Sequence, residues 1–248
     1  INYFSDSGMK ISFDKSSLSF LYNKRVKYQI NKHEKERNLS LLSVFDDFNN
    51  YLFPDYSLKY QPNDVDIVEK LLVDYGIYGN KFVVIAPGSV WATKRWKVEY
   101  FLSLAKMLSE TGVKVILTGS VADKEICDII GQVPNIVNLA GKTSITQTNL
   151  LISKAEYIIT NDSSPIHFAG LTNTKTYAIF GPTIPEFGFS PTGKNDAVIQ
   201  NNNLKCRPCA IHGGNKCPLE HHKCMSDITP DMVFEIISSH QNLLTLVD

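Results

Sequence analysis

The sequence predicts an α/β fold, a Rossmann-like parallel sheet with helices on both faces, over residues 77–248. From Lys81 onward, short apolar stretches alternate regularly with amphipathic ones. The apolar stretches are continuous, as expected for strands that are buried on both faces. Because six such stretches follow one another in this rhythm, we expect one sheet covered on each side by helices.

The expected strands come in chain order. They are KFVVIAPG (81–88), VKVILTGS (113–120), NIVNLAG (135–141), YIITND (157–162), TYAIFGP (176–182) and DAVIQN (196–201). The expected helices are VEYFLSLAKMLSETG (98–112), DKEICDIIGQV (123–133), SITQTNLLISKA (144–155), PIHFAGLTN (165–173) and DMVFEIISSHQNLL (231–244). Helix-end signals support these limits: a glycine follows the first helix, and Pro165 and Thr229-Pro230 suit first turns.

Residues 1–76 have a less regular pattern. Short apolar and aromatic runs in residues 4–31 indicate two strands, or a loop with an edge strand. A helix is expected from about His33 to Leu52, because its Leu and Phe residues are spaced for one buried face. Residues 54–63 contain two prolines and resemble a linker, and Asp64–Tyr75 is predicted to be an amphipathic helix closed by a glycine.

Residues 24–37 are locally basic, with six Lys or Arg against Glu34 and Glu36. One interpretation is an ordinary solvated surface. The other is a landing area for an anionic acceptor molecule. Both remain open from the sequence.

The composition excludes several classes of protein. With 248 residues and 43% apolar residues, the chain can form one large or two small domains with a substantial core. The formal net charge is zero, so no nucleic-acid partner is expected. No apolar run approaches the roughly 18–20 residues of a membrane span, and no signal peptide is recognisable.

The common nucleotide-binding fingerprints are absent from the sequence. The first strand is followed by APGS (86–89), not by G-x-G-x-x-G. The segment AGKT (140–143) is like the end of a P-loop, but Ile136 stands where the leading glycine is required. A dehydrogenase or a P-loop NTPase is therefore not expected.

The turn after the first strand carries groups that suit an anionic ligand. Gly88 lets the backbone approach a ligand, and Ser89 and Thr93 can donate hydroxyl hydrogen bonds. Lys94 and Arg95 supply cations at the carboxyl edge, where open α/β sheets bind their ligands. The alternative is two solvated charges on a loop.

The turn after the fourth strand is equally polar. Asp162 can accept from a ribose or sugar hydroxyl, and Ser163 and Ser164 can bind phosphate oxygens at a helix N-terminus. His167 lies one turn into that helix, where a purely structural role is the alternative.

A third turn, after the fifth strand, contains Gly181 and Thr183. Because the carboxyl ends of parallel strands meet at one edge, the three turns are expected to form one pocket. We predict that this pocket holds a nucleotide diphosphate.

Four ordered motifs carry a resemblance to a known family. They are KRW (94–96), TNDSSPIHFAG (160–170), IFGPT (179–183) and ITPDMVFEII (228–237). Together they resemble the C-terminal half of the ADP-heptose:lipopolysaccharide heptosyltransferases, most closely the heptosyltransferase II type. NKHEKERNLSLL (31–42) resembles a segment late in that family's N-terminal half.

The resemblance implies a GT-B fold, two Rossmann-like domains with the active site between them. Residues 1–76 would be a remnant of the N-terminal acceptor domain with a linker, and residues 77–248 the nucleotide-sugar-binding domain. It also implies an inverting transfer of heptose from ADP-heptose to the lipopolysaccharide inner core, without a catalytic metal or other cofactor. Such an enzyme is expected in the cytoplasm or peripherally at the inner membrane.

The resemblance also implies roles for single residues. Lys94 would contact the donor diphosphate and, with the helix N-terminus, stabilise the negative charge on the departing ADP. The other residues of the implied ADP-sugar pocket are Ser89, Asp162, Ser163, Ser164 and His167. Family members usually have Gly where this chain has Ser164, which bears on how closely the backbone approaches phosphate.

The catalytic base is expected outside this sequence. In the family it is an Asp of the N-terminal domain, whose first strand leads into a GD-x-x-x-x-x-P loop. No such segment precedes residue 77. We expect roughly one hundred residues of that domain to be missing. The chain alone is therefore expected to bind donor weakly and not to turn over.

A cysteine-rich segment, residues 206–224, contains Cys206, Cys209, Cys217 and Cys224 with three interleaved histidines. Four cysteines at this density could hold a structural zinc. The alternatives are reduced thiols in a cytosolic loop, or disulfides formed after purification. Cys127, inside an expected helix, is predicted to be a small core residue.

Two other functions remain open from the sequence. One is a binding module that senses or stores a nucleotide sugar without chemistry. The other is a nucleotide-sugar epimerase of GT-B fold, which would carry more acid and base residues at this edge. The basic 24–37 segment suits a phosphate-bearing acceptor and favours the transferase.

Overall fold

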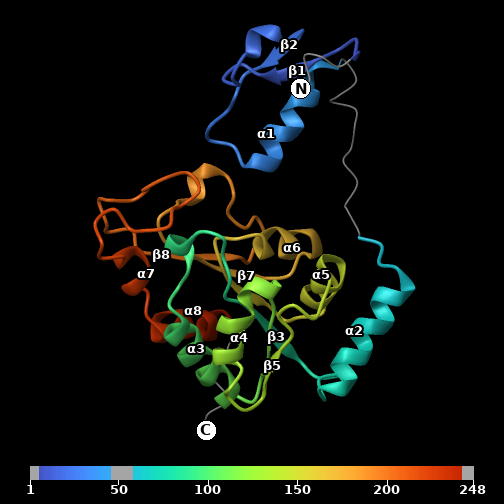
Figure 1. Cartoon of the computed structure of the whole chain (residues 1–248), viewed down its shortest axis with the longest axis vertical. Coiled ribbons are helices and arrows are strands. Elements are labelled where there is room, and N and C mark those ends of the chain that lie inside the picture. Colours follow the sequence, from blue (N-terminus) through green and yellow to red (C-terminus); the bar gives the residue numbers. More distant parts are fainter. Residues whose placement is uncertain (1–5, 46–57, 242–248) are drawn as a thin grey trace. The chain divides into compact units, whose positions relative to one another are not determined.

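The computed structural model describes residues 6–45 and 58–241 (Figure 1). They form two compact units. The N-terminal unit comprises the chain up to Tyr56 together with Pro185–Ser190, and the sheet unit comprises Ser57–Ile184 and everything from Pro191 onward. These units differ from the predicted division after residue 76 in two ways. Helix α2 (Pro62–Asp74) packs with the sheet. The hexapeptide Pro185–Ser190, which follows the fifth strand of the sheet, packs with the N-terminal unit.

The sheet unit contains the six predicted strands, all parallel. They are β3 (Phe82–Ala86), β4 (Lys114–Leu117), β5 (Ile136–Asn138), β6 (Ile158–Asn161), β7 (Thr176–Phe180) and β8 (Ala197–Gln200). Their order across the sheet is β5-β4-β3-β6-β7-β8. Strands β4 and β5 are therefore added on one side of β3, and β6, β7 and β8 on its other side. This confirms the predicted Rossmann-like sheet and puts a topological switch point between β3 and β6.

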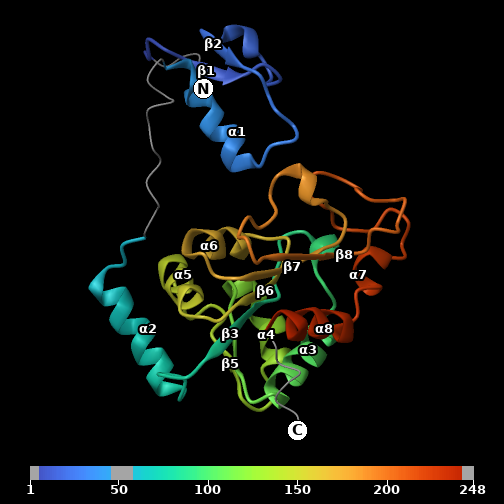
Figure 2. The same cartoon turned by 180° about the vertical axis from the view of Figure 1, so that it is seen from behind.

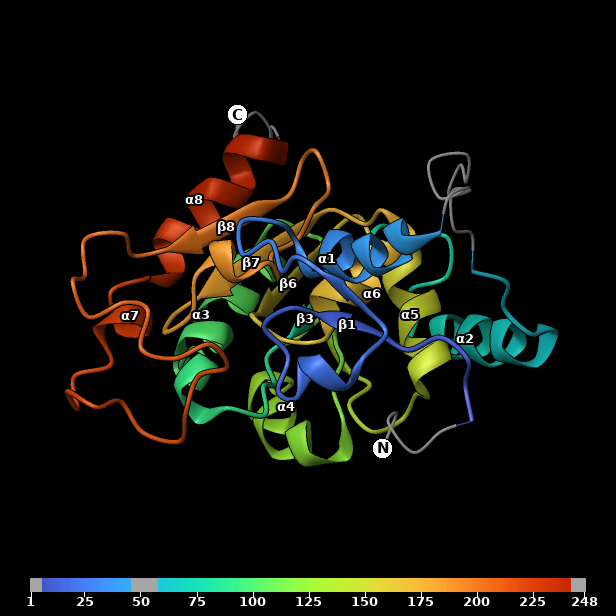
Figure 3. The same ribbon diagram turned by 90° about the horizontal axis from the view of Figure 1, so that it is seen from above.

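Helices cover both faces of this sheet, as Figures 2 and 3 show. Successive side chains of β3 point to opposite faces, so Val83 and Ile85 pack in one core and Phe82, Val84 and Ala86 in the other. The first core is covered by α3 (Val98–Glu110), α4 (Lys124–Ile130) and α8 (Pro230–Gln241). The second is covered by α2, α5 (Ile145–Ser153) and α6 (Pro165–Thr172).

Local sequence explains where these helices begin and end. Ser144 and Gln147 form a capping box at the start of α5, in which each side chain bonds to the other residue's backbone N–H. Helices α2, α6 and α8 each begin at a proline, whose missing N–H is not needed there. Asn173 ends α6 in the left-handed conformation, with φ 55°. A short helix, α7 (Lys223–Ser226), begins at the end of the cysteine-rich segment and includes Cys224.

The N-terminal unit contains two short parallel strands, β1 (Ile11–Phe13) and β2 (Lys24–Val26), and helix α1 (Glu34–Ser40). The helix predicted from His33 to Leu52 is shorter in the described part of the chain, because the backbone tightens into a 3₁₀ turn at Leu41–Val44. Its predicted continuation beyond residue 45, and most of the predicted linker, lie outside the described residues.

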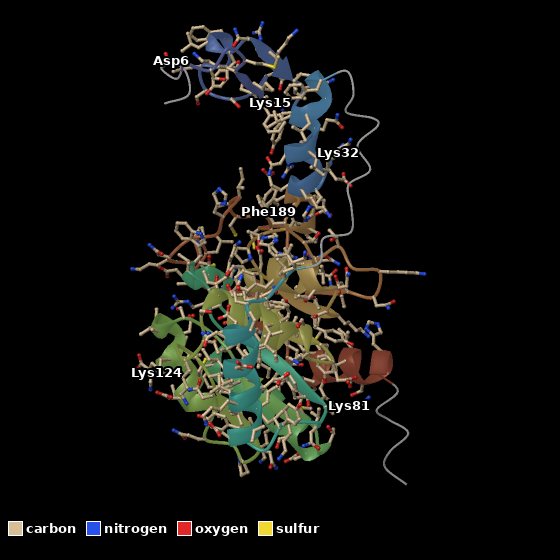
Figure 4. All side chains as sticks on the ribbon, turned by 90° about the vertical axis from the view of Figure 1, so that its right-hand side faces the viewer. Asp6, Lys15, Lys32, Lys81, Lys124 and Phe189 are labelled. Atoms are coloured by element: carbon tan, nitrogen blue, oxygen red, sulfur yellow. The ribbon has the colours of Figure 1, made fainter. Side chains whose placement is uncertain are left out.

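Arg37 organises this unit from the buried face of α1, where it is only 2% exposed. Its guanidinium pairs with Glu34 at 2.6 Å and donates to the carbonyls of Ile30 (3.1 Å) and Phe187 (2.6 Å). The N–H of Glu34 also donates to Gly188 O at 2.8 Å. Two labels in Figure 4 help to find these segments: Phe189 lies in the hexapeptide Pro185–Ser190, and Lys32 lies just before α1. One of the six cations of the basic 24–37 segment is therefore structural and does not belong to a charged surface.

Among residues 6–45 and 58–241, no helix combines the length and the apolar composition that crossing a membrane requires.

Candidate functional site

The loop after β3 and the turn after β6 are held together by one buried amide. The Asn161 side chain accepts from the N–H of Trp96 (3.0 Å) and donates to Pro87 O (2.7 Å). It thus fixes both ends of the 87–96 loop to the last residue of β6. Because Asn161 is fully buried, both bonds form in a low-dielectric interior and strongly define the loop position.

Further contacts complete this junction. The hydroxyl of Ser163 lies 3.3 Å from Gly88 O, and the guanidinium of Arg95 donates to Ser89 O at 2.7 Å. A 3₁₀ turn at Ala92–Lys94 then directs the Lys94 side chain back toward β6. The two turns that the sequence singled out therefore meet at the switch point of the sheet.

An ion pair joins the two turns directly. Lys94 Nζ lies 2.6 Å from Asp162 Oδ2, with the two side chains 12% and 8% exposed. The hydroxyl of Thr183, which follows β7, donates to the same carboxylate oxygen at 2.6 Å. Asp162 therefore connects the ends of β3, β6 and β7, and a ligand phosphate near Lys94 would share the ammonium with this carboxylate.

A cavity of about 560 Å³ opens at this junction. Six of the predicted site residues line it, namely Ser89, Lys94, Arg95, Asp162, Ser163 and Ser164. Pro165, the first residue of α6, also lines it, so the positive end of that helix dipole adjoins the cavity. The volume is in the range of cavities that hold small ligands and cofactors.

Four other predicted residues do not line this cavity. Thr93 is buried, with its hydroxyl bonded to Gly214. Gly181 packs on α7, since a Cβ there would lie 2.8 Å from Met225 Cε. Thr183 contacts the cavity only through Asp162. His167 is exposed on α6.

The loop after β4 supplies lining residues that the sequence interpretation did not include. These are Thr118, Gly119, Ser120, Ala122 and Asp123. The Asp123 carboxylate caps this loop by accepting from the N–H and hydroxyl of Ser120, at 2.8 and 2.7 Å. It also occupies the space that a Cβ at Gly88 or Gly119 would need. The sequence did contain a signal for this loop, because LTGS (117–120) stands at the carboxyl end of a predicted strand, where open α/β sheets bind ligands.

Thr118 differs from the other hydroxyls around the cavity. It is 1% exposed, and its Oγ1 has no hydrogen-bond partner among the residues that the structure describes. Burying an unpaired hydroxyl costs about 1–3 kcal/mol. A ligand atom in the cavity would offset that cost.

Further lining residues come from α5, from the residues just before it, and from α6. Thr143, Ile145, Thr148 and Phe168 line the cavity, and the hydroxyls of Thr143 and Thr148 lie 2.8 Å apart. The site as a whole combines a paired cation, several hydroxyls and apolar side chains such as Trp91, Ile145 and Phe168. That set suits a ligand with an anionic part and a flat apolar part.

The cysteine-rich segment does not support the predicted zinc. Within residues 6–45 and 58–241, no three His, Cys, Asp or Glu side chains converge well enough to hold a metal ion. Cys209, Cys217 and Cys224 line one small cavity, but their thiols are not free ligands: the Cys209 thiol donates to Cys206 O at 3.2 Å, and Cys224, a residue of α7, is buried in the core. Burial, with a smaller effect of Cys209, raises the pKa of the Cys224 thiol to about 11, so it stays protonated at neutral pH.

The fold is shared with solved heptosyltransferase structures. The chain aligns with E. coli ADP-heptose lps heptosyltransferase II at a TM-score of 0.71 and 23% identity, over 96% of this chain and 70% of that one. It aligns with a glycosyl transferase family 9 protein of Veillonella parvula at a TM-score of 0.76 and 16% identity, over 96% and 68%. At these identities the similarity establishes the fold alone. It agrees with the predicted GT-B architecture.

Curated relatives show closer sequence similarity. Lipooligosaccharide heptosyltransferase 2 of Campylobacter jejuni serotype O:6 is 32% identical over 223 residues, which are 86% of this chain and 67% of that protein. Its counterpart in serotype O:2 is 36% identical over 63% of this chain and 50% of its own length. Lipopolysaccharide heptosyltransferase 2 of Escherichia coli K12 is 32% identical over 62% of this chain and 44% of its own length. The chain thus spans between 44% and 67% of these relatives.

The family itself is identified by a match that covers most of the chain. Residues 1–219 match the glycosyltransferase family 9 (heptosyltransferase) profile, so both the N-terminal unit and the cavity-forming part of the sheet unit are included. The heptosyltransferase resemblance of the four motifs is thereby confirmed. The chain belongs to glycosyltransferase family 9.

Proposed function

We propose that this chain is the donor-binding part of an inverting glycosyltransferase that moves a heptose from ADP-heptose to the lipopolysaccharide inner core. The observation that carries the proposal is the convergence of Lys94 and the hydroxyls of Ser89, Ser163 and Ser164 on one cavity at the switch point of the sheet. A cation and several hydroxyl donors beside a helix N-terminus suit a pyrophosphate.

The relatives supply the identity of the nucleotide and the sugar. A structure of E. coli heptosyltransferase WaaC with ADP has a TM-score of 0.61 to this chain, and one of the heptosyltransferase TibC with ADP-D-beta-D-heptose has a TM-score of 0.52. The curated relatives named as heptosyltransferase 2 act, by their names, on lipooligosaccharide or lipopolysaccharide. We carry ADP-heptose and the lipopolysaccharide acceptor over from them.

The chemistry follows from the residues around the cavity. When ADP departs, negative charge grows on its terminal phosphate, and Lys94 together with the N-terminus of α6 stabilises that charge. Asp162, at 2.6 Å from Lys94, holds the ammonium in place before the donor arrives. The base that deprotonates the acceptor hydroxyl would be an Asp of the family's N-terminal domain. The reaction would occur in the cytoplasm or at the cytoplasmic face of the inner membrane.

Calorimetric titration of the 248-residue chain with ADP, UDP and GDP tests the donor site. We expect ADP to bind and the other two nucleotides to bind at least about tenfold more weakly, which is a difference of about 1.4 kcal/mol. Equal affinities for all three, or no ADP binding, would contradict the proposed donor.

A second experiment tests the reaction itself. The full-length protein, with ADP-heptose and a heptose-deficient lipopolysaccharide core, should release ADP and extend the acceptor, whereas the 248-residue chain alone should not. ADP binding without transfer by the full-length protein would favour the non-catalytic binding module. Interconversion of the donor sugar in the absence of acceptor would favour the epimerase.

A further inference from the structure

The turn that carries Lys94 is bonded to the cysteine-rich segment (residues 206–224), which lies more than a hundred residues away in sequence. The N–H of Thr93 donates to Gly214 O at 2.9 Å. The Thr93 hydroxyl donates to the same carbonyl at 2.9 Å and accepts from Gly214 N–H at 2.8 Å. The carbonyl of Thr93 accepts from His222 Nε2 at 2.8 Å. One residue therefore makes four hydrogen bonds to this segment.

The segment also packs directly on the Lys94 side chain. Gly213 has φ +84°, and a Cβ at this position would lie 3.1 Å from Lys94 Cγ and 3.3 Å from Thr93 Oγ1. A side chain at this position would be strained by the positive φ and would press on Lys94 and Thr93. The aliphatic stem of Lys94 thus lies between this backbone and the ion pair with Asp162.

The cysteine-rich segment is itself anchored to the sheet. The guanidinium of Arg207 bonds to the carbonyls of Gly181 and Thr183, and Cys209 N–H donates to Pro182 O at 2.9 Å. At its other end Cys224 is buried in the core. The segment is therefore fixed at the end of β7 and, through Cys224 of α7, in the core, so that its bonds to Thr93 fix the position of that residue.

From these contacts we infer that the cysteine-rich segment positions Lys94 for the donor diphosphate, with Thr93 and Gly213 as positioning residues that do not touch the ligand themselves. This assigns a role to a segment for which the sequence suggested only a metal. It also explains why the Thr93 hydroxyl, predicted to bind substrate, bonds to Gly214. The inference rests on the proposed function, since it concerns the same cavity.

A double-mutant cycle on ADP affinity tests whether Thr93 acts through Lys94. Thr93→Val should weaken ADP binding about tenfold, because it removes the two hydrogen bonds of the Thr93 hydroxyl that fix the turn. Thr93→Ser should restore affinity to within about twofold. In a Lys94→Met background, Thr93→Val should have almost no further effect. Thr111→Val, which removes a hydroxyl bonded to Leu108 O at the end of α3, is the matched control and should leave affinity unchanged.

A measurement without nucleotide separates this inference from the proposed function. Labelling with an amine-reactive reagent, followed by mass spectrometry, should modify Lys94 at least about threefold faster in Thr93→Val than in the wild type or Thr93→Ser, because the loosened turn exposes its ammonium more often. Labelling of Lys81, which is 81% exposed, should not change.

The outcomes are distinguishable. Unchanged Lys94 labelling in Thr93→Val, or an equal loss of ADP affinity with and without Lys94, would overturn the positioning role. If the wild type does not bind ADP while Lys94 labelling responds as expected, the positioning role stands and the proposed donor is wrong.

Discussion

The ammonium of Lys94 lies 2.6 Å from a carboxylate oxygen of Asp162, and both side chains are almost fully buried. This pair bridges β3 and β6, the two strands from which the sheet grows in opposite directions. A buried ion pair contributes little net stability but defines geometry, because breaking it leaves an unpaired charge. The pair therefore presents a single, oriented cation to the cavity.

Replacing Lys94 should separate its binding role from its structural role. Lys94→Met is expected to weaken ADP binding by roughly one to two orders of magnitude, in line with the loss of a charge-assisted contact of about 1.5–3 kcal/mol. It should also destabilise the protein by about 3 kcal/mol, because Asp162 remains buried without its cation. Calorimetry and urea unfolding measure the two effects.

The double variant Lys94→Met/Asp162→Asn removes the unpaired charge and should recover most of the stability, but not the ADP affinity. Lys81→Met, at an exposed lysine labelled in Figure 4, should change neither quantity. If the double variant regained ADP binding, Lys94 would not be the diphosphate ligand.

Thr118→Val should have opposite effects on stability and on binding. The valine is nearly isosteric and removes a buried hydroxyl that has no partner among the described residues, so the free energy of unfolding should stay the same or rise by up to about 1 kcal/mol. ADP affinity should fall about five- to tenfold, because the cavity loses a hydrogen-bonding group.

The matched control is Thr174→Val. The Thr174 hydroxyl donates to Ile152 O at 3.0 Å and is remote from the cavity lining, so its loss should lower stability without affecting ADP. Tighter or unchanged ADP binding by Thr118→Val would show that the nucleotide does not use this hydroxyl.

Stability should decrease above pH 9. Burial, followed by the carboxylates of Asp123 and Asp128, raises the pKa of the Cys127 thiol from 9.0 to about 12. Below pH 9 this thiol is protonated in both states; above it the unfolded chain ionises first, so stability is lost as the pH rises toward 12. The free energy of unfolding should fall by about 1.4 kcal/mol per pH unit for each such thiol. The pKa of the Cys224 thiol is raised to about 11, so this thiol adds to the fall between pH 9 and about pH 11.

Urea unfolding between pH 8 and 10.5 measures this slope. Cys127→Ala should lower the free energy of unfolding by about 1 kcal/mol at pH 7, because it leaves a cavity. It should also make the free energy of unfolding fall less steeply as the pH rises. Val115→Ala destabilises the same core without removing a thiol, so its slope should match the wild type. If the free energy of unfolding of Cys127→Ala fell with pH as steeply as that of the wild type, the Cys127 thiol would not be a cause of the alkaline loss of stability.

Arg37→Met should loosen the N-terminal unit. It removes the guanidinium that bonds to Ile30 O and Phe187 O, and it leaves Glu34 without its partner. Because Arg37 is buried, we expect the free energy of local unfolding of this unit to fall by about 3 kcal/mol. Hydrogen exchange of the Glu34 amide, which donates to Gly188 O, should become faster.

The exposed Lys35→Met is the control and should leave that amide protected. Exchange of Val84 in β3 should also be unaffected by Arg37→Met. Unchanged protection at Glu34 would mean that the hexapeptide is held by other contacts.

Much of the sheet unit could be predicted because its signals are local. Each strand is a short, continuous apolar run, and the proline and serine residues that begin the helices act on their own turn. The region before residue 60 was harder, because its strands are only three residues long and its helix gives way to a 3₁₀ turn within two turns. Short elements contain too few residues for a periodicity to be recognised.

The sequence by itself determined the six-strand parallel sheet, its family, and the edge at which Lys94, Asp162 and the serines gather, because continuous apolar strands separated by helices run parallel and share one carboxyl edge. Only the tertiary structure decided the partner of each side chain. Thr93 bonds to a residue 121 positions away, and Arg37 to one 150 positions away. Such pairings depend on where the folded chain brings distant segments within about 3 Å, which residue type and local spacing do not specify.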